Sequence, residues 1–215
     1  MSKHAAGTTP TAASSIQWLA VHRFLMSPAR LIPGTIESLP RSFSLLPITI
    51  NQLITLLGEY VQQTGAGVDL LLVDGLALQA YGYGDRSTQD VDGEVAGDLD
   101  SLVQFLRQHQ VPADLGENMS GWSVVAMPPG YRDRVSVLHE KPGLRLRLLH
   151  PIDFVIAKLR RGTEIDIEDA TYVARRFGVT PEAVSEAAEA AISASPRDTT
   201  IFLFRKTVEI FCARL

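Results

Sequence analysis

The chain has 215 residues, of which 46% are hydrophobic and 20% charged, and its formal net charge is −4. These values are typical of a globular protein with one domain or a small core with an appendage. The single cysteine, Cys212, excludes a disulfide framework and argues against a zinc site built from several thiolates. No run of about 18 apolar residues and no secretory signal occurs, so we expect a cytoplasmic protein without a membrane partner.

The N-terminal residues 1–45 are predicted to form an irregular or partly disordered arm. Residues 1–15 are small and polar, and prolines interrupt any periodicity in the rest of the arm. Translation from Met1 and translation from Met26 are both compatible with this composition.

The folded core is predicted to begin at Thr49, whose spacing to Gln52 is that of a capping box. Apolar residues at helical intervals follow, and Gly65 ends the helix. Residues 68–73 form a short apolar run that predicts a buried strand, and residues 75–81 predict a short helix directly after it.

The next part of the core is predicted to be mostly strand. Residues 88–95 alternate as a strand does, and residues 98–108 have the apolar spacing of a helix. Residues 121–127 and 134–139 resemble the arms of a hairpin. Residues 143–149 alternate clearly and predict a further strand.

The last third is predicted to be helical. Pro151 suits the first position of a helix, and Thr163 and Asp166 have the spacing of a cap for the next one. Thr-Pro at 180–181 and Ser-Pro at 195–196 predict two more helix starts. The order of elements indicates an α+β fold.

We therefore expect a mixed β-sheet flanked by helices, followed by a helical part. The predicted boundaries are 46–150 for the α/β core and 151–215 for the helical C-terminal part packed on it.

The segment 73–95 carries the most chemical information. Residues two apart in a strand point to one face, so Asp90 and Asp92 are expected to project together. Neighbouring carboxylates repel unless a cation relieves them, and Mg²⁺ held by carboxylates and substrate phosphates does so. Gly75 would let backbone N–H groups approach a phosphate, and Arg86 would add positive charge. The alternative is that Asp-x-Asp is solvated polar surface.

The same segment resembles the core motif of the polymerase-beta-like nucleotidyltransferase superfamily. Arg86, Thr88, Asp90 and Asp92 match its Arg-x-Thr-x-Asp-x-Asp pattern, and Gly75 matches the second residue of its glycine pair. More specifically, the chain is similar to bacterial nucleotidyltransferase-like proteins related to AbiEii-type toxins.

A second block of the resemblance lies in residues 150–179. Lys158, Asp166 and Asp169 fall on the family's pattern of a helix ending in Lys-Leu followed by an Asp-x-x-Asp helix. In a helix the two aspartates share a face. The alternatives are a surface lysine and a charged first turn that favours the helix dipole. Together the two blocks span roughly residues 49–180.

The resemblance implies a Mg²⁺-dependent transfer, with one or two ions, of a nucleotidyl group from a nucleoside triphosphate to an RNA or protein hydroxyl. It also implies a role in a toxin–antitoxin or phage-defence system, with a cognate antitoxin as a partner. The implied catalytic residues are Asp90, Asp92 and Lys158, of which Asp90 and Asp92 bind metal; Gly75, Arg86 and Thr88 bind nucleotide, and Asp166 and Asp169 support them.

Two features depart from the family pattern. Asp74 stands where the family has the first glycine of its pair, and a carboxylate there repels a triphosphate unless it is turned away or paired. A third metal carboxylate is common on a later strand, but the strand expected at 143–149 offers Arg145 and Arg147 instead.

The same residues are compatible with other functions. A catalytically inactive descendant that binds a nucleotide or a protein partner is the main alternative, and Asp74 motivates it. An Asp-x-Asp glycosyltransferase fits poorly, because only about 40 residues separate Thr49 from Asp90. We interpret Trp18 and Trp122 as core or arm anchors rather than base-stacking residues.

Overall fold

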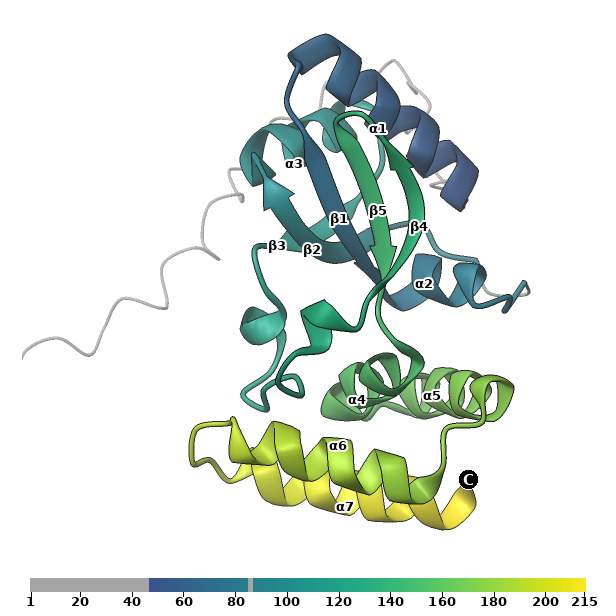
Figure 1. Ribbon diagram of the computed structural model, residues 1–215, viewed down its shortest axis with the longest axis vertical. Helices are drawn as coiled ribbons and strands as arrows, with labels where there is room; N and C mark the ends of the chain where they lie inside the picture. The colour runs from purple at the N-terminus through teal and green to yellow at the C-terminus, as the bar shows by residue number, and fades with distance from the viewer. Residues whose placement is uncertain (1–46, 85–86) are drawn as a thin grey trace, which may run out of the picture. The chain divides into compact units, whose positions relative to one another are not determined.

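The computed structural model describes residues 47–84 and 87–215 (Figure 1). These residues belong to one unit, Ser44–Leu215. The predicted arm at residues 1–45, with both candidate starts, lies outside the described residues, as does Arg86. No helix among the residues that the structure describes is both long and apolar enough to cross a membrane.

The described residues form one mixed sheet with helices around it, followed by helices alone. The strands are β1 (Val68–Val73), β2 (Val91–Gly97), β3 (Ala113–Gly116), β4 (Ser136–Lys141) and β5 (Leu144–Leu148). The helices are α1 (Ile50–Thr64), α2 (Asp74–Ala80), α3 (Leu99–Gln108), α4 (Pro151–Arg161), α5 (Glu164–Phe177), α6 (Pro181–Ser193) and α7 (Thr200–Arg214), with the 3₁₀ turns η1 (Met119–Trp122) and η2 (Tyr131–Asp133). This arrangement confirms the predicted α+β fold with a helical C-terminal part.

The sheet has the strand order β3-β2-β1-β5-β4. β1 is antiparallel to β2 and parallel to β5, while β3 is parallel to β2. β1 and β5 therefore end at the same sheet edge at which β2 and β3 begin. In Figure 1 this edge faces α4, which follows β5 after a short connection. The end of β1 and the beginnings of β2 and β3 thus face the same space next to α4.

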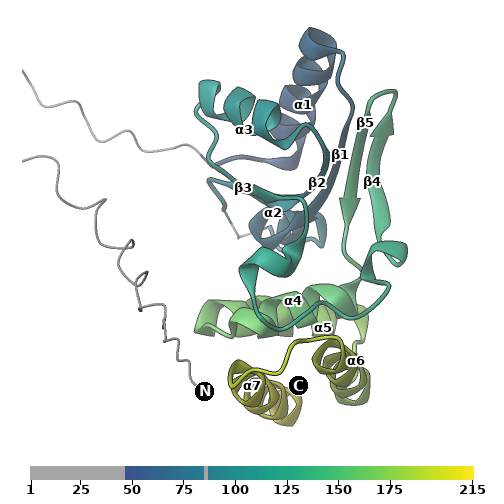
Figure 2. The ribbon, with the colours of Figure 1, turned by 90° about the vertical axis from the view of Figure 1, so that its left-hand side faces the viewer.

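The two faces of the sheet are covered differently. α1 and α3 lie on one face (Figure 2), where Leu70 and Leu72 of β1 are fully buried. On the other face Glu94 of β2 is 5% exposed. Its carboxylate accepts hydrogen bonds from the Met119 N–H and from Arg132, so the segment that contains η1 and η2 covers this part of the sheet.

Local signals explain where several helices begin and end. Thr49 and Gln52 form the predicted capping box of α1, and Gly65 ends that helix at φ 69°, a left-handed conformation that favours glycine. Pro151 occupies the first turn of α4, and a second capping box joins Thr163 to Asp166 at the start of α5. These boundaries bring Lys158 and Arg161 of α4 next to Asp166 and Asp169 of α5.

Three expected elements differ from the structure. The predicted hairpin of residues 121–127 and 134–139 is wrong: the first arm has no strand, and β4 pairs with β5 instead. A strand at Ala113–Gly116 was not expected, because its four residues are too few to show a period. The last helix begins at Thr200, after the expected Ser-Pro start at 195–196.

Candidate functional site

A cavity of about 200 Å³ lies between the sheet edge and α4. Residues from β1, α2, β2, β3, η1 and α4 line it: Val73, Asp74, Asp92, Asp114, Met119, Trp122, Ser123, Phe154, Ala157, Lys158, Arg160 and Arg161. Acidic side chains come from the sheet edge, and the cationic ones all come from the last turns of α4. The cavity therefore has an acidic wall opposite a basic wall.

Two carboxylates of the acidic wall are neighbours across a strand pair. Asp92 of β2 is the register partner of Asp114 of β3, and parallel register partners point to the same face of a sheet. Asp92 is also paired with Val73, the last residue of β1. The strand expected at 88–95 begins only at Val91, so Asp90 precedes the strand rather than lying within it.

Carboxylate crowding changes the protonation of Asp92. Burial, followed by the negative charges of Asp90, Asp74 and Asp114, raises the pKa of Asp92 to about 7. Arg161 opposes this shift, but it does not outweigh the burial and the three acids. The negative charges around Asp92 therefore outweigh the positive charge of Arg161, and a bound cation would relieve this imbalance.

Asp90 is held in place by a short chain of contacts that starts at Gly75. A Cβ atom added at Gly75 would lie 2.5 Å from Thr88 Cβ, so glycine lets the Thr88 side chain pack against α2. Thr88 is buried, and its hydroxyl donates a hydrogen bond of 2.6 Å to Asp90 Oδ1. The structure thus gives Gly75 and Thr88 a steric and positioning role for Asp90.

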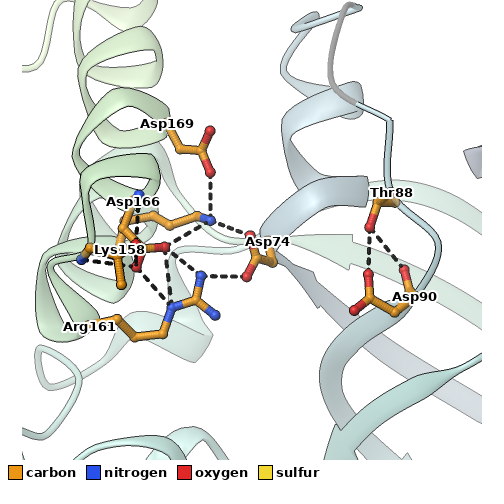
Figure 3. A network of polar contacts seen from close by, with 8 residues as sticks. Asp74, Thr88, Asp90, Lys158, Arg161, Asp166 and Asp169 are labelled. Atoms are coloured by element: carbon orange, nitrogen blue, oxygen red, sulfur yellow. Dashed lines mark hydrogen bonds and ion pairs between the residues drawn. The ribbon is translucent and has the colours of Figure 1, made fainter.

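The basic wall is tied to the sheet edge by an ion-pair network (Figure 3). Lys158 is 4% exposed, and its Nζ donates to Asp74, to Asp169 at 2.8 Å and to Asp166 at 3.3 Å. Arg161 contacts Asp74 Oδ2 at 2.6 Å and also donates to Asp166. Asp74 is therefore paired with two cations.

The remaining wall of the cavity is apolar and is held against α4 by Arg160. The Arg160 guanidinium donates to the carbonyl oxygens of Val125 at 2.7 Å and Met119 at 3.0 Å. Burial lowers the pKa of Arg160 to about 10, and the nearby Tyr131 and Glu94 only partly oppose this shift. Trp122, the last residue of η1, lines the cavity and also packs, half-buried, against the hydrophobic core, as its interpretation as an anchor expects.

The structure brings most of the expected site residues into one neighbourhood. Asp92 and Lys158 line the cavity, Asp90 acts electrostatically on Asp92, and Asp166 and Asp169 contact Lys158. Arg86 lies outside the described residues. Arg145 and Arg147 are elsewhere on the sheet, where they pair with Glu140 and Asp69.

Sequence reasoning missed Asp114, Arg160 and Arg161. Asp114 was missed because its strand was missed; the search for a third acid went to residues 143–149 instead. The two arginines directly follow Lys158 and Leu159 at the end of α4, and their positions in the last turn are those expected of residues that interact with the helix dipole. That Arg160 and Arg161 also line the cavity follows only from the position of this turn in the folded chain.

The donor set at the acidic wall suits Mg²⁺ better than a transition metal. Mg²⁺ is bound through one or two carboxylates plus substrate phosphates, and carboxylate oxygen is the only donor type that Asp90, Asp92 and Asp114 offer. Within residues 47–84 and 87–215, no group of three or more His, Cys, Asp or Glu side chains is arranged to hold a metal by itself. The residues present thus fit an ion that arrives with substrate phosphates.

Comparison with protein families agrees with this arrangement. Residues 49–175, more than half of the chain, match the model of a family described as "Nucleotidyltransferase of unknown function (DUF6036)". The chain belongs to this family. The match includes the whole sheet, α4 and nearly all of α5, so the residues of the cavity and of the ion-pair network lie within the matched region. No curated protein shows significant similarity to the chain.

Proposed function

We propose that this DUF6036 member is a Mg²⁺-dependent nucleotidyltransferase that moves a nucleotidyl group from a nucleoside triphosphate to an RNA or protein hydroxyl. The observation that carries the proposal is the pair of opposed walls in one cavity: Asp92 and Asp114 on the sheet edge, and three cationic side chains on α4. A metal-bound triphosphate complements both walls, because its cation meets the carboxylates while its phosphate oxygens meet the cations.

Asp90 and Asp92 are the proposed metal ligands, and Asp114 is placed beside them to complete the acidic wall. A third carboxylate provides oxygen atoms for a second ion. When bound, Mg²⁺ supplies charge neutralisation and orientation of the phosphates. The elevated pKa of Asp92 supports this assignment, since a carboxylate in that state gains most from a nearby cation.

The proposed reaction forms a bond between the acceptor hydroxyl oxygen and the α-phosphorus. The bond from that phosphorus to the bridging oxygen of the β-phosphate breaks, pyrophosphate leaves, and the hydroxyl proton passes to water. Lys158 and Arg161 stabilise the negative charge that builds up on the departing pyrophosphate. Asp166 and Asp169 orient Lys158 through their ion pairs with its Nζ.

An apolar wall next to these charges gives the proposal a place for the nucleobase. Met119, Trp122 and Phe154 line the cavity on this side. An indole ring offers a flat surface on which a base stacks, and such contacts are worth about 1 to 3 kcal/mol per base. Glu94 and Arg160 hold η1, so the position of Trp122 is set before a ligand arrives.

A second candidate function rests on Asp74. Its carboxylate is already paired with Lys158 and Arg161, the cations assigned to the phosphates. This arrangement favours the alternative of an inactive member that binds a nucleotide or a protein partner without transfer.

The biological role is proposed from the resemblance alone. Similarity to AbiEii-type toxins implies a cytoplasmic toxin–antitoxin or phage-defence component with a cognate antitoxin. An RNA or a protein hydroxyl as acceptor has the same basis.

The test is transfer of radiolabel from α-³²P-labelled nucleoside triphosphates to total RNA and to protein, with and without Mg²⁺. We expect Mg²⁺-dependent labelling that Asp90→Asn abolishes. Asp100→Asn, which changes an exposed aspartate of α3, is the matched control and should label normally. Nucleotide binding without labelling of either acceptor would favour the inactive alternative, and labelling that survives Asp90→Asn would contradict the site.

A further inference from the structure

We infer that the Asp74 carboxylate is a built-in competitor of the substrate polyphosphate, which must displace it from Lys158 and Arg161 in order to bind. The inference rests on the proposed function. It adds that Asp74 weakens the binding of ligands in the cavity, and that these ligands are polyphosphates. The contacts, charges, exposure and backbone conformation of Asp74 each support it.

The contacts of Asp74 resemble those of a phosphate group. One carboxylate oxygen accepts from Lys158 Nζ, and the other lies 2.6 Å from Arg161 Nη2. Figure 3 shows the long side chains of Lys158 and Arg161 extending from α4 to meet Asp74 beside the end of the sheet. Two anionic oxygens thus bridge two cations, an arrangement that two oxygens of a phosphate can replace contact for contact.

The network does not need the charge of Asp74. Lys158 and Arg161 carry two positive charges, and Asp166 and Asp169 alone supply two negative charges. Asp74 is therefore a third carboxylate for two cations. Its removal leaves buried Lys158 with both remaining partners, so an unpaired buried charge does not result.

Exposure separates Asp74 from the other two acids. The side chains of Asp166 and Asp169 are 1% and 0% exposed, whereas that of Asp74 is 19% exposed and lines the cavity. A ligand that enters the cavity therefore meets Asp74 and not the other carboxylates of the network. Asp74 is the contact that such a ligand can exchange with.

Backbone conformation indicates that Asp74 occupies its position at a cost. Its φ is +57°, in the left-handed region that non-glycine residues rarely adopt. Glycine takes this conformation without strain, and asparagine tolerates it better than most residues do. The backbone at residue 74 would therefore suit glycine, and the aspartate brings its carboxylate to this position in spite of the strain.

The expected consequence is a preference for polyphosphates. A ligand that only replaces the two contacts of Asp74 gains little binding free energy, because Asp74 already makes those contacts. A triphosphate that also reaches the metal ligands at the acidic wall adds interactions that Asp74 does not make, and these favour displacement.

The experiment measures binding of inorganic tripolyphosphate and of inorganic phosphate by calorimetry, with Mg²⁺ present, to the full chain and three variants. Asp74→Asn removes the charge but keeps the size, and Asp74→Gly removes the side chain. Asp69→Asn is the matched control, because Asp69 also contacts two arginines, Arg145 and Arg147, away from the cavity. Thermal unfolding of each variant is recorded in parallel.

We expect both Asp74 variants to bind tripolyphosphate about tenfold more tightly than the parent, with thermal stability retained and with Asp69→Asn unchanged. Equal or weaker binding by the Asp74 variants, an equal gain in Asp69→Asn, or no binding by any form would overturn the inference. The proposed function is judged separately by the labelling assay. Tighter binding without nucleotidyl transfer would support the inference about Asp74 and contradict the proposed enzymatic function. Transfer without tighter binding would support the enzymatic function and contradict the inference.

Discussion

Asp92 of β2 and Asp114 of β3 are register partners in a parallel strand pair, and both side chains line the cavity beside α4. Neighbouring strands are about 4.8 Å apart, so the two carboxylates interact strongly unless a cation lies near them. This relationship gives the acidic wall a third carboxylate on a later strand. It also places that carboxylate on β3, a strand that the sequence pattern did not predict.

Asp114→Asn is expected to lower the pKa of Asp92 from about 7, because one of the charges that raises it is removed. Titration of the Asp92 side chain by NMR would measure this. Asp133→Asn, which changes an exposed aspartate of η2, is the control and should leave the Asp92 titration unchanged. An unaltered pKa in Asp114→Asn would show that Asp114 does not contribute to the shift.

The pKa of Asp92 predicts how stability depends on pH. The folded-state pKa of about 7 lies above the ordinary value of 3.8, so the folded chain holds a proton that the unfolded chain releases between these values. The free energy of unfolding should therefore fall as the pH rises from about 4 to about 7. Denaturant titrations at several pH values would detect this, and Asp92→Asn should flatten the dependence across that range.

Mg²⁺ affinity should change with pH in the opposite sense. Metal binding requires the deprotonated carboxylate, so affinity should increase as the pH rises through about 7. Calorimetric titration with Mg²⁺ and a nucleoside triphosphate at pH 6 and pH 8 would measure the change. Binding that is tighter at the lower pH would contradict a metal-ligating role for Asp92.

Lys158→Met should destabilise the fold by about 3 to 5 kcal/mol, because it leaves the carboxylates of Asp166 and Asp169 buried without their shared cation. Chemical denaturation would give the value. Lys206→Met is the matched control: Lys206 is exposed on α7 and pairs with exposed Glu209. It should cost at most about 1 kcal/mol, and equal losses in the two variants would argue against the buried network.

Gly75→Ala should destabilise the chain by about 1 to 3 kcal/mol, since the new Cβ would overlap Thr88. The same change should weaken Mg²⁺-dependent nucleotide binding, because Thr88 positions Asp90. Gly58→Ala in α1 is the control: no atom lies within 4 Å of the added Cβ, and helix propensity makes the change neutral or stabilising. Normal nucleotide binding by Gly75→Ala would contradict the positioning role.

The parts of the fold that were predicted correctly have strong local signals. The capping box at Thr49 and the apolar run of β1 are readable from a few adjacent residues. β3 was not predictable in the same way, because its four residues form a strand only through pairing with β2. The expected hairpin failed for a related reason, since Val125 and Ala126 are held by Arg160 and Ser195 from distant parts of the chain.

The candidate site was predictable where its residues follow a spacing. Asp90 and Asp92, and Asp166 and Asp169, were found from their intervals and from the family resemblance. The pairing of Asp74 with Lys158 joins residues 84 positions apart, and no local pattern predicts it. The role of Trp122 likewise depends on where Arg160 and Glu94 hold η1, which only the folded chain determines.

The most direct test of the central claim is calorimetric titration of the purified chain with ATP, CTP, GTP and UTP, each with and without Mg²⁺. The account predicts micromolar binding of at least one nucleotide that requires Mg²⁺ and disappears in Asp90→Asn. Absence of binding by all four nucleotides in the parent chain and in Asp74→Gly would contradict the claim that this cavity is a nucleotide site.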